Sequence, residues 1–101
     1  MQLTKAVNLY PKPHVGKTLQ EIAVSTSAVQ LSAFDLQTHY VLVEVKTASV
    51  YVTFDNSTPS STNGHSLAAG YREFWSRQTA QAAKFIQNSG AARVVASPFT
   101  D

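Results

Sequence analysis

The strongest constraint in the sequence is a two-residue alternation of apolar and polar side chains over residues 40–55. Within residues 40–46 and 49–55, every second position is apolar: Val41, Val43, Val45, Val50, Val52 and Phe54. Because successive side chains of a strand point to opposite faces, this spacing predicts two amphipathic strands. Only residues 47–49 lie between them, a length that suits a hairpin.

Similar but shorter patterns predict further strands and one helix. The strands are expected at residues 19–25, 28–34, 66–68, 71–75 and 91–96, with Pro98 ending the last one. Residues 79–87 carry apolar side chains at helical spacing and several alanines, with Ser76 as the N-cap, which predicts a short helix. Residues 55–64 contain no apolar side chain, and this predicts a long surface loop.

The composition agrees with an all-β class. The chain has 11 Val and 10 Thr but only five Lys and three Glu, and β-branched residues favour strands over helices. With 101 residues there is material for one domain. We therefore predict a mainly β fold: a small antiparallel, jelly-roll-like β-sandwich over residues 19–101, with one short helix near the C-terminus.

The first eighteen residues differ from this domain. Lys5, Lys12 and Lys17 have no acidic residue among them, and Pro11 and Pro13 bracket Lys12. Since proline excludes helix and removes a ladder donor, residues 1–18 are predicted to form an extended arm, with an ordinary first strand as the alternative.

Enzymatic chemistry finds little support in the sequence. There is no cysteine, and the three histidines, at positions 14, 39 and 65, have no metal-binding spacing. No nucleophile elbow or glycine-rich phosphate loop occurs. We expect no catalytic site, no metal and no cofactor.

Nucleic acid and membranes are not expected as partners either. The net charge of +2 is too small to indicate nucleic-acid binding, and no apolar run has the length of a signal peptide or a membrane span. The aromatic residues are more informative. Tyr40, Leu42 and Tyr51 have the parity opposite to the valines, which predicts an apolar outer face covered by a second sheet or by another subunit.

The C-terminal half resembles a known class of proteins. The segments are V-Y-V-T-F-D-N-S-T-P-S-S-T-N-G-H (residues 50–65), L-A-A-G-Y (67–71), W-S (75–76), A-A-K-F-I (82–86) and A-S-P-F-T (96–100). They resemble small structural proteins that tailed bacteriophages encode beside their capsid genes. The resemblance implies a capsid decoration, or cement, protein: a small β-sandwich, often trimeric. It would fold in the cytoplasm of the bacterial host and bind the major capsid protein on the outer surface of the virion.

Under this hypothesis the capsid and subunit contacts divide between two regions. The arm would contribute Lys5, Tyr10, Lys12 and Lys17, for each of which an ordinary solvated side chain is the alternative, and the tyrosine face would contribute Tyr40, Tyr51 and Tyr71. A tail or head-completion protein would have the same composition. A third hypothesis is a carbohydrate-binding module in which Trp75 and Tyr71 stack on sugar rings.

Overall fold

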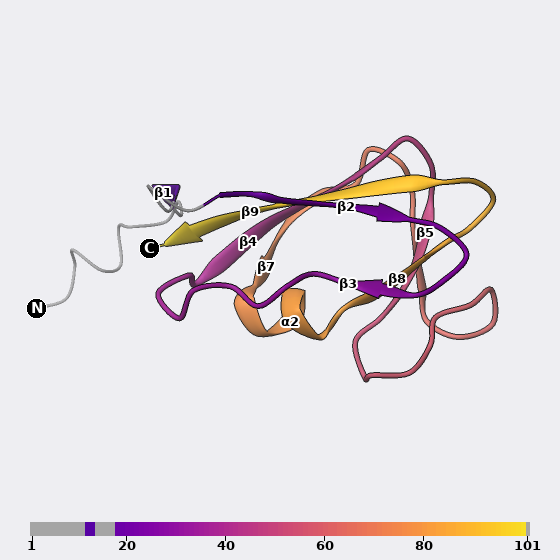
Figure 1. Cartoon of the computed structure of the whole chain (residues 1–101), viewed down its shortest axis with the longest axis horizontal. Coiled ribbons are helices and arrows are strands. Elements are labelled where there is room, and N and C mark those ends of the chain that lie inside the picture. The colour runs from indigo at the N-terminus through magenta and orange to yellow at the C-terminus, as the bar shows by residue number, and fades with distance from the viewer. Residues whose placement is uncertain (1–11, 14–17, 101) are drawn as a thin grey trace, which may run out of the picture.

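The fold is mainly β, with two antiparallel sheets and little helix, as predicted (Figure 1). The computed structural model describes the backbone of residues 12–13 and all of residues 18–100. The strands are β1 (Lys12–Pro13), β2 (Gln20–Val24), β3 (Val29–Gln30), β4 (Tyr40–Lys46), β5 (Val50–Thr53), β6 (His65–Leu67), β7 (Arg72–Ser76), β8 (Lys84–Gln87) and β9 (Ala92–Thr100). The helix α2 spans Arg77–Ala82.

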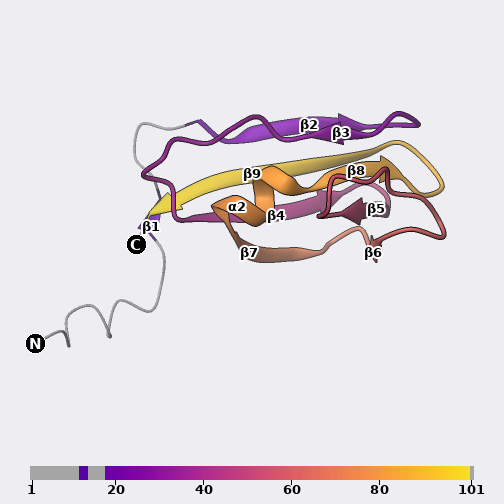
Figure 2. The same ribbon diagram turned by 90° about the horizontal axis from the view of Figure 1, so that it is seen from below.

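Each sheet joins strands that are distant in the sequence. In sheet A, β9 pairs with β4 on one edge and with β1 and β2 on the other, and β4 also pairs with β7. In sheet B the order is β3, β8, β5 and β6. Figure 2 places β2 and β3 at one edge of the molecule and β6 and β7 at the opposite edge. Consecutive strands thus form the two edges, one strand from each sheet.

The core combines side chains from both sheets. Its members include Val41, Val43, Val45, Trp75, Val94 and Ala96 of sheet A and Val50, Val52 and Phe85 of sheet B. The predicted parity of the valines is confirmed, because all five valines of β4 and β5 are completely buried. Each such side chain contributes about 1.5 kcal/mol or more by leaving water.

The predicted hairpin of β4 and β5 is wrong. Both strands form, but β4 belongs to sheet A and β5 to sheet B. The backbone reverses sharply at Thr47, which has a φ of 80°, and the Ala48 N–H donates to the Lys46 carbonyl at 2.9 Å. Since β7 and β9 occupy the two edges of β4, no edge is left for β5. In the same way β6 and β7 both form but belong to different sheets.

The predicted N-cap of the helix, Ser76, is correct, whereas the helix begins at Arg77, two residues earlier than predicted, and its predicted end is wrong. The Ser76 hydroxyl caps α2 by accepting a hydrogen bond from the Thr79 N–H at 3.1 Å. The helix ends at Ala82, however, and residues 84–87 form β8. Phe85 is completely buried there, between β3 and β5, so its packing overrides the helical propensity of the alanines before it.

The last strand does not end before Pro98 as predicted. Strand β9 continues to Thr100, and Pro98 lies opposite Val41 of β4. On the other edge of β9, β2 pairs as far as Ala96 and β1 begins at Phe99. Within the described strands Pro98 therefore lies where that edge has no partner, a position at which the missing N–H costs no ladder bond.

Strand β3 is also shorter than expected, and residues 31–39, which we call the strap, are irregular. Side chains satisfy much of its backbone. The Gln20 amide donates to the Ser32 carbonyl at 2.9 Å and accepts from the Ser32 N–H at 2.7 Å, as a neighbouring strand would. Gln81 of α2 accepts from the Phe34 N–H at 2.7 Å, and Arg77 donates to the Thr38 carbonyl at 3.1 Å. These bonds tie the strap to β2 and to α2.

Candidate functional site

The outer face of sheet A carries exposed apolar side chains. Residues of β4 that alternate with the buried valines point away from sheet B, and the registers place Phe74 opposite Leu42 and Phe99 opposite Tyr40. The Phe74 and Phe99 rings meet edge to face, with centroids 5.1 Å apart. We call Tyr40, Leu42, Phe74 and Phe99 the outer patch.

The outer patch is partly accessible to solvent. Tyr40 is 40% exposed and Phe74 is 45% exposed, whereas Leu42 and Phe99 are half-buried. Aromatic rings dominate it, and aromatic rings are enriched at the centres of protein interfaces. An exposed cluster of this kind, on a regular sheet, is typical of a surface that binds another protein.

Charged side chains lie on the same face beyond the patch. Glu44 of β4 is opposite Arg72 of β7, and Arg93 of β9 forms a salt bridge with Glu21 of β2. These pairs place both signs of charge next to an apolar centre. The combination resembles the polar rim around the apolar core of a protein interface.

Strand β1 lies beside the outer patch. Pro13 pairs with Phe99 and Lys12 with Thr100, so β1, a described piece of the predicted arm, joins sheet A on the edge of β9 opposite to β4 (Figure 1). Lys12 and Tyr40, two predicted contact positions, therefore lie on opposite edges of β9, where they pair with Thr100 and Phe99 respectively. The other arm residues predicted to bind, Lys5, Tyr10 and Lys17, lie outside the described residues.

The predicted common face of the tyrosines does not exist. Tyr40 belongs to sheet A, whereas Tyr51 is half-buried on β5 in sheet B and its hydroxyl donates to the Asn88 side chain at 3.0 Å. Tyr71 precedes β7 and packs against the core. The reason is the broken hairpin, since β4 and β5 would have shared a face only as neighbours in one sheet.

Trp75 and Tyr71 do not form a sugar-stacking surface. Trp75 is only 9% exposed, and its indole N–H donates to the Tyr71 hydroxyl at 2.9 Å. Both rings therefore belong to the packing between the sheets.

Two members of the outer patch, Phe74 and Phe99, were not predicted from the sequence. Only the register of β4 with β7 and β9 brings them together, and the alternation within each strand does not encode that register.

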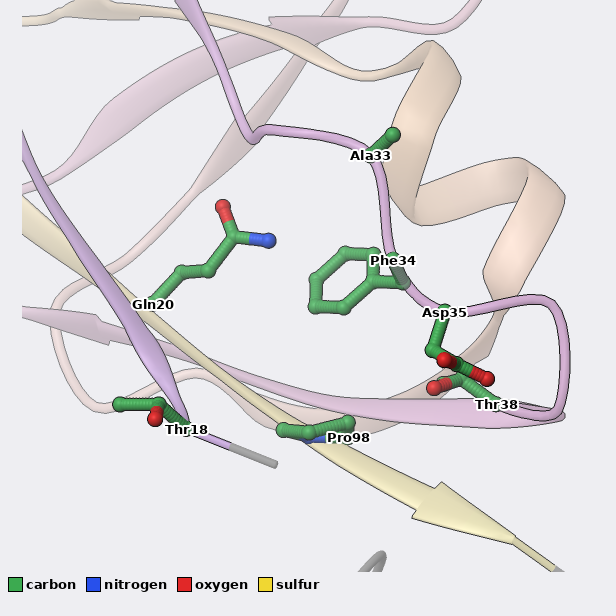
Figure 3. A pocket seen from close by; sticks show the side chains of 7 residues that line it. All are labelled: Thr18, Gln20, Ala33, Phe34, Asp35, Thr38 and Pro98. Carbon is green, nitrogen blue, oxygen red and sulfur yellow. The ribbon is translucent and has the colours of Figure 1, made fainter. Parts of the chain in front are cut away.

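A cavity of about 380 Å³ lies beneath the strap. Thr18, Gln20, Ala33, Phe34, Asp35, Thr38 and Pro98 line it. Figure 3 shows the Phe34 ring between Gln20 and the turn that carries Asp35. The Gln20 amide is bonded to Ser32, and Asp35 accepts from the Gln37 N–H at 2.8 Å. Because these polar groups are already engaged within the chain, we assign no ligand to this cavity.

The described residues hold no group of three or more histidine or acidic side chains arranged to bind a metal. His39 precedes β4, whereas His65 begins β6 in the other sheet.

Asp55 is a described residue whose pKa departs from its ordinary value. Hydrogen bonds from the Ser57 hydroxyl and the Ser57 N–H lower the pKa of this carboxyl. No helix in the described part of the chain has the length and apolar character needed to cross a bilayer.

Comparison with known proteins adds no family to this description. No protein-family model, no curated protein and no solved structure matches the chain. The function must therefore be argued from the outer patch, from the fold and from the residues themselves.

Proposed function

We propose that this protein is a structural, non-enzymatic component of a tailed-bacteriophage virion, a capsid decoration or cement protein. It folds in the cytoplasm of the bacterial host, forms a homo-oligomer, with a trimer favoured, and binds the shell of the major capsid protein on the outer surface of the head. Bound there, it stabilises the head against the pressure of the packaged genome.

The outer patch is the observation that carries this proposal. Tyr40 and Phe74 remain about half exposed on sheet A, next to charged pairs of both signs and next to β1. The free energy falls when another protein covers such a surface, because apolar side chains then leave water. A decoration protein needs contacts of this kind and needs no reactive group.

The strand order supports the proposal by fold analogy. Strands β1, β2, β9, β4 and β7 form one sheet, in which β1 and β2 follow each other along one edge of β9, and β3, β8, β5 and β6 form the other. We propose that the two sheets pack as a sandwich of the jelly-roll type, an eight-stranded arrangement found in viral capsid proteins and in lectins. Fold alone does not determine function, so the resemblance of residues 50–101 to small phage structural proteins carries more weight.

The mechanism is multivalent binding. In an oligomer every chain presents the same contacts, so that several weak contacts are made at once to neighbouring capsid subunits. The second and later contacts are then intramolecular, and the whole oligomer stays bound although each contact alone would dissociate. Lys12, at the start of the described chain, and Tyr40, on the outer patch, are the described positions at which we place contacts.

The experiment has two parts. Light scattering on the purified protein should give three times the chain mass of 10.9 kDa, and the protein should sediment with empty phage heads that lack it. The variant Phe74→Asp should lower both oligomer mass and sedimentation, because it places a charge in the outer patch. The control is Leu36→Asp, a change of the same kind at an 80% exposed residue on a turn, and it should behave like the wild type.

A monomer at every concentration that also fails to sediment with heads would contradict the proposal. The alternative, a tail or head-completion protein, is separated by copy number. A decoration protein is present in hundreds of copies per particle and a completion protein in few, so quantitative mass spectrometry of purified virions distinguishes them.

A further inference from the structure

A second cavity, of about 260 Å³, lies on sheet B. Thr53, Phe54, Asp55, Asn63, Gly64 and His65 line it. These residues end β5, begin β6 and form the two ends of the loop between them. The cavity shares no residue with the outer patch, and the proposed capsid role does not use it.

A rigid aromatic platform forms one wall. Phe54 is 38% exposed and meets Trp75 edge to face, with ring centroids 5.3 Å apart. Trp75 in turn stacks on the buried Phe85, with centroids 6.1 Å apart and an interplanar angle of 6°. The His65 ring lies 6.1 Å from that of Phe54. The exposed ring is therefore backed by the core and cannot easily turn away.

Two polar side chains in the cavity are held in place and still have free acceptors. One Asp55 carboxylate oxygen accepts from the Ser57 N–H at 3.1 Å and from the Ser57 hydroxyl at 2.5 Å. The Asn63 amide nitrogen donates to the Ser57 hydroxyl at 3.0 Å and to the Thr58 carbonyl at 2.8 Å. Within the described residues, no hydrogen bond uses the Asn63 side-chain oxygen, and both Ser57 bonds go to the same Asp55 oxygen, which leaves the second Asp55 oxygen without a bond from Ser57. Both are available to a ligand with hydroxyl donors.

The loop itself is preorganised. Pro59 is completely buried, and Ser60 and Asn63 exchange two backbone hydrogen bonds of 2.9 and 3.2 Å. Lys84 of β8 donates to the Asn56 carbonyl at 3.1 Å. This loop, predicted from its lack of apolar residues and its turn-forming residues, is fixed at both ends and in the middle. A ligand would therefore lose little free energy in ordering it.

The lining chemistry selects a class of ligand. Neither lysine nor arginine lines the cavity, and Asp55 is an anion at neutral pH, so the lining disfavours a phosphate or sulfate ester. An exposed aromatic ring favours a ligand with a flat apolar face. Oriented carboxylate and amide oxygens favour neighbouring hydroxyl groups. A pyranose ring has both features, with C–H groups on one face and hydroxyls around its edge.

We propose that this cavity binds one neutral hexopyranose unit of a saccharide. The sugar ring stacks on Phe54, and its hydroxyl groups donate to Asp55 and Asn63. The volume lies just below the roughly 300–1,000 Å³ of sites for drug-sized ligands, which suits a single sugar unit. This site differs from the predicted one, since Phe54 replaces the buried Trp75 as the stacking ring.

The test is a titration of the ¹⁵N-labelled protein with glucose, galactose, mannose and N-acetylglucosamine, combined with a glycan array. We expect amide shift changes in residues 53–65 and in the Trp75 indole with at least one sugar. Phe54→Ala and Asp55→Asn should each weaken binding about tenfold or more. Leu36→Ala, which removes an 80% exposed apolar side chain outside both the cavity and the outer patch, should bind like the wild type.

Three results would overturn the proposal: no response to any sugar or glycan, shift changes centred on the outer patch, or unchanged affinity in both cavity variants. Amide spectra of the two variants establish that they are folded. Because the measurement uses neither capsids nor oligomer mass, its failure leaves the capsid proposal as it stands, and the reverse also holds.

Discussion

At the scale of single residues, Gly64 is a position at which the fold requires glycine. Its φ is 109°, and a Cβ atom there would collide with the Val52 carbonyl oxygen and lie 2.8 Å from the Thr53 methyl group. We expect Gly64→Ala to lower the free energy of unfolding by more than about 2 kcal/mol, because it combines backbone strain with a clash against a strand. Urea denaturation measures the change.

Substitutions at two other glycines distinguish the effect of backbone strain from the effect of the clash. Gly70 has a φ of 97° but open space around the Cβ position, so Gly70→Ala should cost only the strain, about 1 kcal/mol. Gly90 has open space and a φ outside the left-handed region, so Gly90→Ala should be neutral or slightly stabilising. Equal effects at all three glycines would refute the assigned role of Gly64.

Asp55 gives the loop over residues 55–64 a dependence on pH. Because the Ser57 hydroxyl and N–H donate to its carboxylate, the pKa of Asp55 in the folded protein lies below its ordinary value of 3.8. The stabilisation from these bonds is complete above the unfolded pKa and is lost as the pH falls through the folded pKa. We expect the Ser57 amide resonance to titrate with a midpoint below 3.8 in an NMR pH series.

The matched variant for this titration is Asp55→Asn, in which the Ser57 amide should show no such step. A midpoint above the ordinary value, or the same step in the variant, would mean that another group controls the loop. Near neutral pH the wild-type carboxylate is charged, which is the state the proposed saccharide site requires.

At the scale of elements, Gln20 replaces a missing strand. Its side-chain amide makes both a donated and an accepted bond with the backbone of Ser32, so it continues the edge of β2 onto the strap. Gln20→Ala should lower stability by about 1 kcal/mol and speed hydrogen exchange at the Ser32 amide. Gln20→Glu should do the same, because a carboxylate cannot donate to the Ser32 carbonyl.

The control at this scale is Gln78→Ala on α2, where the side chain is exposed and makes no hydrogen bond within the described residues. It should leave both stability and the exchange of Ser32 unchanged. Unaltered exchange at Ser32 in both Gln20 variants would show that the strap is held by Gln81 and Arg77 alone.

The elements also show where sequence reasoning succeeds and where it stops. The alternation of valines located β4 and β5 and their inner faces correctly, because burial on one face fixes the parity of a strand. It assigned them to one hairpin, although β4 pairs with residues 72–76 and 93–99 and β5 with residues 65–67 and 84–87. Pairing depends on contacts between distant segments, so a local pattern cannot reveal it.

The same limit applies to the sites. Tyr40 was predicted as a contact residue, but its neighbours on the outer patch come from β7 and β9. The residues of the saccharide cavity were known only as parts of a polar loop and a strand end. Trp75, the ring that the sequence suggested for sugar stacking, is buried because it lies on the face of β7 that packs against sheet B. The short segment around Trp75 does not determine which of its faces is buried.

At the scale of the whole molecule, β9, the described strand nearest the C-terminus, lies in the interior of sheet A. Strand β9 lies between β4 and both β1 and β2, and Ala92, Val94 and Ala96 contribute to the core. Sheet A therefore cannot form until residues 92–100 are available, and such non-local pairing makes folding slow, on the order of milliseconds to seconds. We expect a chain that ends at residue 91 to lack a cooperative urea transition.

A complementation experiment distinguishes the loss of β9 from misfolding of the remaining chain. A synthetic peptide of residues 92–101, added to the truncated chain, should restore the transition, because it supplies the edge of β4 and the three buried side chains. A peptide with Val94→Asp should fail, since Val94 is completely buried. If the truncated chain alone unfolded cooperatively, β2 and β4 would have to close the sheet without β9, and the register described here would not govern folding.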